Sequence, residues 1–561
     1  METLKQRVAF PPAWLSFALI GSLLLLGTRL HPNADLANYM LYLHSFVFDQ
    51  DLFLANNLEV AGKPIFVSST GYPFDIHNLG VALFWLPFYV VAQLIARLSP
   101  TVAAQVDGFD LYSIMWLKLA DWFYGLLALH FCYLALQRLV PRRTALFSTL
   151  VVAVGSSFGY YMGPLTPSTH MVSAFLAALF LYAFLNTRQS ESPATWRTLG
   201  IVGSLALTIA NTNVALLALP VVYFASTPPS RRWLTQGSHF ALAYLLAFLP
   251  QMVAWYLFTG NPFKSPYGSQ LSWLQPHLLE TLFSPYHGLY FYAPLLLLAT
   301  VGLCLPRVLE WRLALGSLLA LGVTAYLSSI NLAWWAGGSF GARYFIGMTP
   351  FFALGLAALV ESLPAVGRRV LWGFVALSAF WTLLLYLPLH SNPALSEYYP
   401  LAEHLRRVAL TPSTLAALAQ GLSVSTLLIG LLLLPLFILL ALWLWRQRRL
   451  PGRVADALFS SAWSVVVPLV LLALIGVALL RSPAAKARCE ASQCDSAWIH
   501  AEVDQWDLAH TYAERARYHE RRGEHEAALA DMEQALQIYP ADPKLQQWLE
   551  ELRENSRDLL R

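Results

Sequence analysis

The most unusual residue of the chain for its position is Asp35, which lies five residues beyond the first apolar run, 13–30. A carboxylate so close to a hydrocarbon boundary costs free energy to desolvate unless it has a partner or a chemical role. An ionised carboxylate can take the proton of a hydroxyl group, which is a poor nucleophile until that proton leaves. The position therefore favours a general base. An N-cap or interface carboxylate stays open as the alternative, because Asp35 opens a helix-like stretch that runs to Phe46.

Further acidic side chains follow in the same polar segment. Asp49 and Asp51 carry the oxygen ligands that a divalent cation or a sugar hydroxyl would need, although a solvated loop is the simpler interpretation. Asp75 and His77, two positions apart, could share a metal ion, but an isolated pair is a weak signal. The sequence therefore leaves a divalent metal ion open and defines no set of metal ligands.

Basic and imidazole side chains occur at similar boundaries farther along the chain. Arg343 precedes an apolar run and follows three glycines, which let the backbone approach a ligand closely. Its guanidinium group suits a phosphate and would stabilise the charge of a departing one; contact with lipid headgroups is the alternative. Lys264 offers a second positive charge to such a phosphate. His170 begins a helix and could hydrogen-bond a sugar, or simply lie at the interface.

The composition is that of a membrane protein that crosses the bilayer many times. The 561 residues are 57% hydrophobic and 12% charged, against about 25% charged residues in soluble globular proteins. The aromatic content of 14% fits belts at the two membrane interfaces. A net charge of +4 gives no indication of nucleic-acid binding.

A membrane-spanning helix needs about 20 apolar residues. We expect spanning helices in the runs 13–30, 111–138, 144–162, 169–186, 198–211, 213–226, 239–258, 288–305, 311–329, 344–362, 369–389, 422–445 and 461–480. The two runs around Asn211 and Asn213 are short and predict a tight hairpin that does not fully cross. Lys118 and Asp121 lie three positions apart in one run, where we expect them to neutralise each other.

The run 79–98 holds Pro87 and ends near Arg97, and we place it as a helix on the outer face. Counting it as a span would put Arg142, Arg143 and the later basic clusters outside, against the positive-inside rule. About thirteen spans result from the length rule, with the N-terminus inside and the C-terminus outside. The outer face then collects the polar segments 31–110, 163–168, 259–287 and 330–343.

The last part of the chain, 505–561, reads as a small soluble helical domain after a linker, 482–504. It has the small-residue, turn and stop positions of one 34-residue tetratricopeptide repeat, at Ala516, Gly523, Ala528, Ala535 and Pro540. One repeat cannot bury its own apolar face. We expect it to pack on flanking helices, on the membrane domain or on a second copy; a helical hairpin without a partner is the alternative. In the linker, Cys489 and Cys494 are equally compatible with a disulfide and with two thiols.

Across residues 10–390 the sequence resembles the GT-C superfamily of polyprenyl-phosphate-sugar-dependent transferases, which includes protein O-mannosyltransferases and the aminoarabinose transferase of lipid A. Five features agree in order: Asp35 with Tyr39 one helical turn later, Asn78–Tyr89 with its proline, Pro167-Ser-Thr-His170, Ser284-Pro-Tyr-His287-Gly-Leu-Tyr290, and Gly337-Gly-Ser-Phe-Gly-Ala-Arg-Tyr344. Protein O-mannosyltransferases carry an Asp-Glu pair at the first feature, whereas Asp35 here precedes Leu36, which argues against protein mannosylation.

The resemblance implies an all-α membrane protein with a GT-C-like domain over 1–481, helices lying along its outer face, and the added repeat outside. It implies inverting transfer of a sugar from a polyprenyl-phosphate donor to a hydroxyl of a lipid, glycan or protein at the periplasmic face of a bacterial inner membrane. Asp35 would be the base. The expected substrate-binding residues are Arg343, Lys264, His170, Tyr39, Asp49, Asp51, His77, Asn78 and His287. The repeat would bind an acceptor or partner protein.

Three other functions are compatible with many spans. A transporter or flippase would be expected to show paired repeats with helices broken near the middle of the membrane, and the sequence shows no duplication. An oligosaccharide polymerase or ligase would be expected to place its main outer loop late in the chain, whereas the longest polar segment here is 31–110. A structural assembly protein is the plainest alternative.

Overall fold

The computed structural model describes residues 34–61, 68, 70–73, 77–100, 106–163, 167–266, 270–305, 308–337, 339–391, 473, 476–478, 480–488, 503–540 and 542–559. The runs 13–30 and 422–445, most of 461–480, and Asp75, Cys489 and Cys494 lie outside these residues. The regular elements of the described part are all helices.

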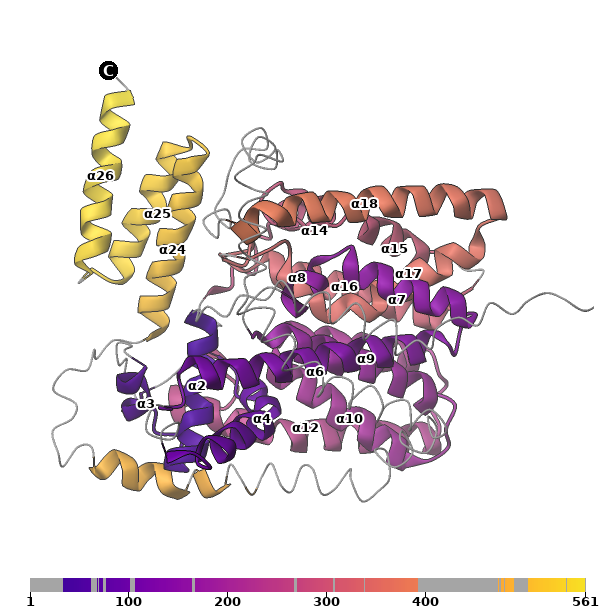
Figure 1. The fold of residues 1–561 in the computed structure, drawn as a ribbon, viewed down its shortest axis with the longest axis horizontal. Coiled ribbons are helices and arrows are strands. Elements are labelled where there is room, and N and C mark those ends of the chain that lie inside the picture. The colour runs from indigo at the N-terminus through magenta and orange to yellow at the C-terminus, as the bar shows by residue number, and fades with distance from the viewer. Residues whose placement is uncertain are drawn as a thin grey trace, which may run out of the picture.

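Six helical segments of the described part are long and apolar enough to cross a membrane, which confirms the expectation of an all-α protein with several spans. They are α6 (Leu111–Leu136), α9 (Thr169–Thr187), α12 (Arg231–Thr259), α16 (Trp311–Ser329), η4 with α17 (Arg343–Met348 and Thr349–Ser362), and α18 (Ala365–Ser391). Figure 1 shows α6, α9 and α18 running along the long axis of the molecule, with α6 and α9 packed against each other. The total of about thirteen spans includes undescribed segments and stays a prediction.

Shorter helices complete the described part of the bundle. They are α2 (Ala34–His44), η1 (Ser45–Asp49), α3 (Ala55–Val60), α4 (Gly80–Ala96), α7 (Arg142–Val154), α8 (Ser157–Met162), α10 (Pro193–Ile209), η2 (Asn211–Leu217), α11 (Ala218–Ala225), α13 (Leu278–Phe283), α14 (Leu289–Tyr292) and α15 (Leu295–Leu303). The helix α4 contains Pro87 and packs against α2 and α6, with Trp85 fully buried. Its predicted place on the outer face stays a prediction.

Two apolar runs that we expected to be continuous helices are each divided. The run 144–162 forms α7 and α8, because Ser156 turns to extended backbone and its side chain caps α8 by accepting from the amide of Phe158. The run 288–305 forms α14 and α15, where Pro294 has no amide hydrogen with which to continue α14.

A sharp turn separates the runs 198–211 and 213–226, as expected, while the prediction that this pair does not fully cross the membrane stays a prediction. Helix α10 ends at Ile209, Ala210 is extended, and η2 packs back against α10. The side-chain amide of Asn213 donates to the carbonyl of Ala206 at 2.8 Å and to Oγ of Ser173 at 2.9 Å. Asn213 thus satisfies a terminal carbonyl of α10 and holds the turn against α9.

The expected neutralisation of Lys118 by Asp121 is also confirmed. Their charged atoms lie 3.7 Å apart in α6, and both side chains are buried. Removing one partner of such a pair would leave an uncompensated buried charge, so a single substitution at either position would be destabilising.

The C-terminal part forms the predicted helix-turn-helix and a third helix. Helices α24 (Val503–Arg521) and α25 (His525–Ile538) are joined at Gly523, whose φ of +75° favours glycine, and α26 (Pro543–Leu559) packs on α25. The small residues expected at the helix crossing are fully buried: Ala516, Ala528 and Ala535. The apolar face of the hairpin is therefore covered by a flanking helix. Its classification as a tetratricopeptide repeat stays a prediction.

Helices α15 and α17 approach so closely that only glycine fits at their crossing. A Cβ atom at Gly355 would lie 2.0 Å from the carbonyl oxygen of Ala299, and one at Gly302 would lie 1.9 Å from the carbonyl oxygen of Gly355. Contacts this short with backbone atoms can be relieved only by moving a helix.

We expect Gly355→Ala to destabilise the protein by about 2 kcal/mol, because the added methyl group must push two backbones apart. The measurement is the midpoint of thermal unfolding of the protein in detergent. The matched control is Gly322→Ala in α16, where nothing lies within 4 Å of the new Cβ atom. Equal midpoints for the two variants would contradict the close crossing.

Candidate functional site

The carboxylate of Asp35 forms an ion pair with a residue from the distant half of the chain. Asp35 lies in the first turn of α2, where a negative charge is favoured by the helix dipole. Its Oδ2 accepts a hydrogen bond of 2.9 Å from Nη1 of Arg343, at the start of η4. The side chains keep 46% and 25% of their accessible surface, so the pair is half-buried and open to solvent.

His77 is the third member of the site. Its Nε2 lies 3.8 Å from Oδ1 of Asp35, and its Nδ1 lies 3.1 Å from the side-chain amide nitrogen of Asn38. Because the amide donates to Nδ1, the remaining hydrogen of a neutral imidazole lies on Nε2, facing Asp35. The ring is buried against the edge of Tyr39 at 4.7 Å, and Tyr42 donates to its backbone carbonyl. His77 therefore has one preferred orientation towards the carboxylate.

These neighbours decide the protonation state of Asp35. Burial alone would raise the pKa of its carboxyl group, but the charge of Arg343 and the proximity of His77 outweigh that effect and hold the pKa far below its usual range. The carboxylate is therefore ionised at every physiological pH. While Arg343 is bound to it, however, it is a weak base.

Arg343 is presented by the loop 331–342. Gly337 and Gly341 have φ values of +62° and +63°, as glycines at a close approach do, and a Cβ atom at Gly337 would lie 3.9 Å from Nη2 of Arg343. The guanidinium group also lies over the ring of Tyr344, at 5.9 Å from its centre. Gly337 thus lies close to the guanidinium group, and the expected close approach of these glycines to a ligand stays a prediction.

His170 lies in the first turn of α9, and its ring packs edge-on against Tyr161 of α8 at 4.5 Å. Tyr161 also accepts a hydrogen bond of 3.1 Å from the amide of Phe340, within the loop that carries Arg343. Both His170 and Tyr161 interact electrostatically with Asp35 and Arg343. The structure therefore brings four predicted residues together with the base candidate: Arg343, His77, Tyr39 and His170.

Asp49 and Asp51 lie apart from this group. They follow the far end of α2, roughly 13 Å along the helix from Asp35 by the rise per residue. Asp49 accepts a 2.7 Å hydrogen bond from Asn57 and lies 3.7 Å from His44. Asp51 is 4% exposed and accepts from Ser45 and from the amide of Phe53. The expectation of a solvated loop is therefore wrong for Asp51, and both carboxylates stabilise the turn after α2.

The remaining predicted residues surround the site at a greater distance. Asn78 donates to Asn211, which donates in turn to Ser265, next to the exposed Lys264. His287 has the unusual φ of +59° and its ring stacks on Tyr292 at 5.6 Å. The contacts of Asn211 connect the segments that contain Asn78 and Ser265.

Sequence reasoning did not find Asn38 or Tyr161. Asn38 follows Asp35 by three positions, which is the helical spacing that places two side chains on one face, so the signal was available. Tyr161 ends an apolar run like many other tyrosines of the chain and has no distinguishing pattern. Within the described ranges, no group of three or more His, Cys, Asp or Glu side chains is arranged to hold a metal ion.

Comparison with known proteins gives little further guidance. No protein-family model matches the sequence, and no curated protein matches it. Among solved structures, the fold is similar to that of the arabinosyltransferase EmbB from Mycobacterium smegmatis, determined by cryo-electron microscopy, with a TM-score of 0.40 and 15% sequence identity. The similarity covers 86% of this chain and 42% of EmbB, so the chain spans less than half the length of that protein.

The ion pair of Asp35 predicts a defined pH dependence of stability. Because the folded-state pKa of the carboxyl is lowered, its stabilisation is fully present above the unfolded value of about 3.9 and is lost as the pH falls through the folded value. We expect Asp35→Asn to cost about 1 kcal/mol, since the pair is half exposed. The difference from wild type in thermal unfolding should be constant from pH 8 to 5. A difference that vanished already at pH 6 would contradict the lowered pKa.

Proposed function

We propose that the chain is an integral membrane glycosyltransferase that moves a sugar from a polyprenyl-phosphate donor to a hydroxyl acceptor, with inversion, at the periplasmic face of a bacterial inner membrane. The observation that carries this proposal is the accessible Asp35–Arg343 pair, flanked by His77 and His170, on a bundle of membrane-spanning helices. A carboxylate and a guanidinium group are the two charges that such a transfer requires on opposite sides of a sugar.

The transfer forms a bond from the acceptor oxygen to the anomeric carbon and breaks the bond from that carbon to the phosphate oxygen. The bonding electrons leave with the polyprenyl phosphate, which gains one negative charge, and the acceptor hydroxyl loses its proton. Arg343 would stabilise the growing charge on the phosphate. Asp35 would accept the proton. His77 and His170 offer hydrogen bonds to the sugar between them.

The ion pair itself suggests how the base is activated. With Arg343 bound, Asp35 holds protons weakly. A donor phosphate would compete with the carboxylate for the same guanidinium group, because both accept its hydrogen bonds in similar geometry. Loss of the Arg343 hydrogen bond raises the proton affinity of Asp35. Binding of the donor would thus make Asp35 a stronger base. Without the donor, Asp35 would be too weak a base to deprotonate water.

Asp35→Asn should lower transfer at least 100-fold, because the amide has the shape of the carboxylate but cannot accept the proton. The measurement compares glycans, lipids and envelope proteins by mass in deletion cells that express wild type or variant. Asp107→Asn is the matched control, since Asp107 is an exposed carboxylate in the same outer segment. Retained product in the Asp35 variant, at normal protein level in the membrane, would remove the base assignment.

Binding of the donor should respond to the two partners in opposite directions. Arg343→Gln should weaken binding of radiolabelled polyprenyl-phosphate sugar about 10-fold or more, because it removes the charge that holds the phosphate. Asp35→Asn should tighten binding several-fold, because the phosphate no longer competes with a carboxylate for Arg343. Equal weakening in both variants would contradict the competition. Absence of binding to wild type would contradict the function itself.

A further inference from the structure

The C-terminal helices are attached to the end of the bundle that carries the candidate site (Figure 1). Tyr518 of α24 enters an aromatic cluster with Tyr286, Trp334 and Trp335, and all four side chains are buried. Its ring stacks on Tyr286 at 5.5 Å and on Trp335 at 5.4 Å, and meets Trp334 edge-on at 5.8 Å. We call these four residues the docking cluster.

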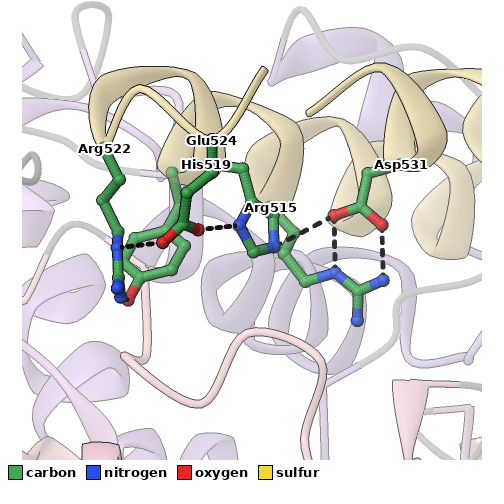
Figure 2. Close-up of polar contacts among 6 residues, drawn as sticks. Arg515, His519, Arg522, Glu524 and Asp531 are labelled. Carbon is green, nitrogen blue, oxygen red and sulfur yellow. Dashed lines mark hydrogen bonds and ion pairs between the residues drawn. The ribbon is translucent and has the colours of Figure 1, made fainter. Parts of the chain in front are cut away.

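Helix α24 is held rigidly behind this contact by a polar network with the start of α25 (Figure 2). Arg515 binds Asp531 through two hydrogen bonds of 2.7 and 2.5 Å. His519 and Arg522 both bind Glu524, at 2.7 and 2.9 Å. A fork-shaped guanidinium–carboxylate pair fixes orientation as well as distance. Helix α24 therefore cannot rotate relative to α25 without breaking several charged contacts.

Two residues of the docking cluster, Trp334 and Trp335, lie on the loop 331–342 that leads to Arg343. Trp335 precedes Arg343 by eight residues. Next to the cluster, Ala336 and His287 have φ values of +65° and +59°, a region that residues with a Cβ atom seldom adopt. Such a conformation is strained and persists only where its surroundings enforce it. Tyr518 stacks on Tyr286 and Trp335, the residues that immediately precede these two positions. The C-terminal domain therefore packs on the loop that presents Arg343.

The same face of α24 brings a carboxylate to the site. Glu514 precedes Tyr518 by four positions, which places the two side chains one above the other on the helix. Glu514 is exposed, and it interacts electrostatically with Arg343, Asp35 and Tyr344.

We propose that the C-terminal domain completes the site: Glu514 is a second carboxylate that binds a hydroxyl of the acceptor, and Tyr518 positions Glu514 and the Arg343 loop. This inference rests on the proposed function. It gives to Glu514 the role of binding a sugar hydroxyl, which the sequence analysis considered for Asp49 and Asp51. Those two carboxylates already accept hydrogen bonds from Asn57, Ser45 and Phe53 within the turn after α2.

The charges of the site also define the class of acceptor. Asp35 and Glu514 both interact electrostatically with Arg343, whose guanidinium group a donor phosphate would occupy. Arg517, which also acts on Glu514, lies over the ring of Trp548 at 4.4 Å. An acceptor with a phosphate or carboxylate next to its reacting hydroxyl would be repelled by both acids. A neutral saccharide offers hydroxyl groups that donate to carboxylates without this repulsion. We therefore expect a neutral, hydroxyl-rich sugar as the acceptor.

The first test replaces Glu514 without changing its shape. In deletion cells that express Glu514→Gln, the amount of transferred product should fall about 10-fold or more, while binding of radiolabelled polyprenyl-phosphate sugar to the purified protein stays within two-fold of wild type. The control is Glu554→Gln, an exposed carboxylate on α26. Normal product in the Glu514 variant would overturn the inference. Loss of donor binding would overturn the acceptor role, as would a product mass that identifies an anionic acceptor.

The second test separates positioning by Tyr518 from a merely structural contribution. Tyr518→Ala should lower product as Glu514→Gln does, and hydrogen exchange should become faster in residues 331–342. Tyr518→Phe keeps the stacked ring and should restore both measurements to near wild-type values. Unchanged exchange and product in Tyr518→Ala would overturn the positioning role. A wild-type protein that binds no polyprenyl-phosphate sugar would instead contradict the proposed function, so the two failures are distinguishable.

Discussion

The arrangement of this protein depends on one ion pair, between Asp35 at the start of α2 and Arg343 at the start of η4. The two residues are 308 positions apart, and each lies where an apolar helical segment meets a polar one. A charge at such a boundary is costly unless it is compensated. The pair compensates both charges at once and leaves each side chain partly accessible. Helix α2 is thereby attached to the start of the segment Arg343–Ser362.

The elements around the pair explain how a half-exposed contact can be held in place. Tyr161 binds the loop through Phe340, and Asn38 and Tyr39 orient His77. The docking cluster packs on the same loop from the side of the C-terminal domain. Three separate parts of the chain therefore converge on one short segment, and the positive φ values at Ala336 and His287 occur where they meet. Preorganisation of this kind places charge before a ligand arrives.

The secondary structure could be predicted in most of its elements because apolar runs of about 20 residues have few alternatives to a helix in a membrane. The predictions were wrong where capping or proline chemistry interrupted a run, at Ser156 and at Pro294. The candidate site was predicted in its charged members. Asp35 and Arg343 were identified because ionisable residues at a hydrocarbon boundary are rare. Asp51 was predicted to lie in a solvated loop, because no pattern in the neighbouring sequence indicates the hydrogen bonds that it accepts from Ser45 and Phe53.

By itself the sequence determined that the chain is a helical membrane protein, that Lys118 and Asp121 compensate each other, and that a helical hairpin with small residues at its crossing follows the membrane part. These features depend on composition and on spacings within a single helix. Only the tertiary structure decided which charges meet. The contact of Asp35 with Arg343, and the approach of Glu514 and Tyr518 to the same loop, join segments separated by well over a hundred residues. The geometry of these contacts is set by the packing of whole helices, and this packing cannot be predicted from a local sequence pattern.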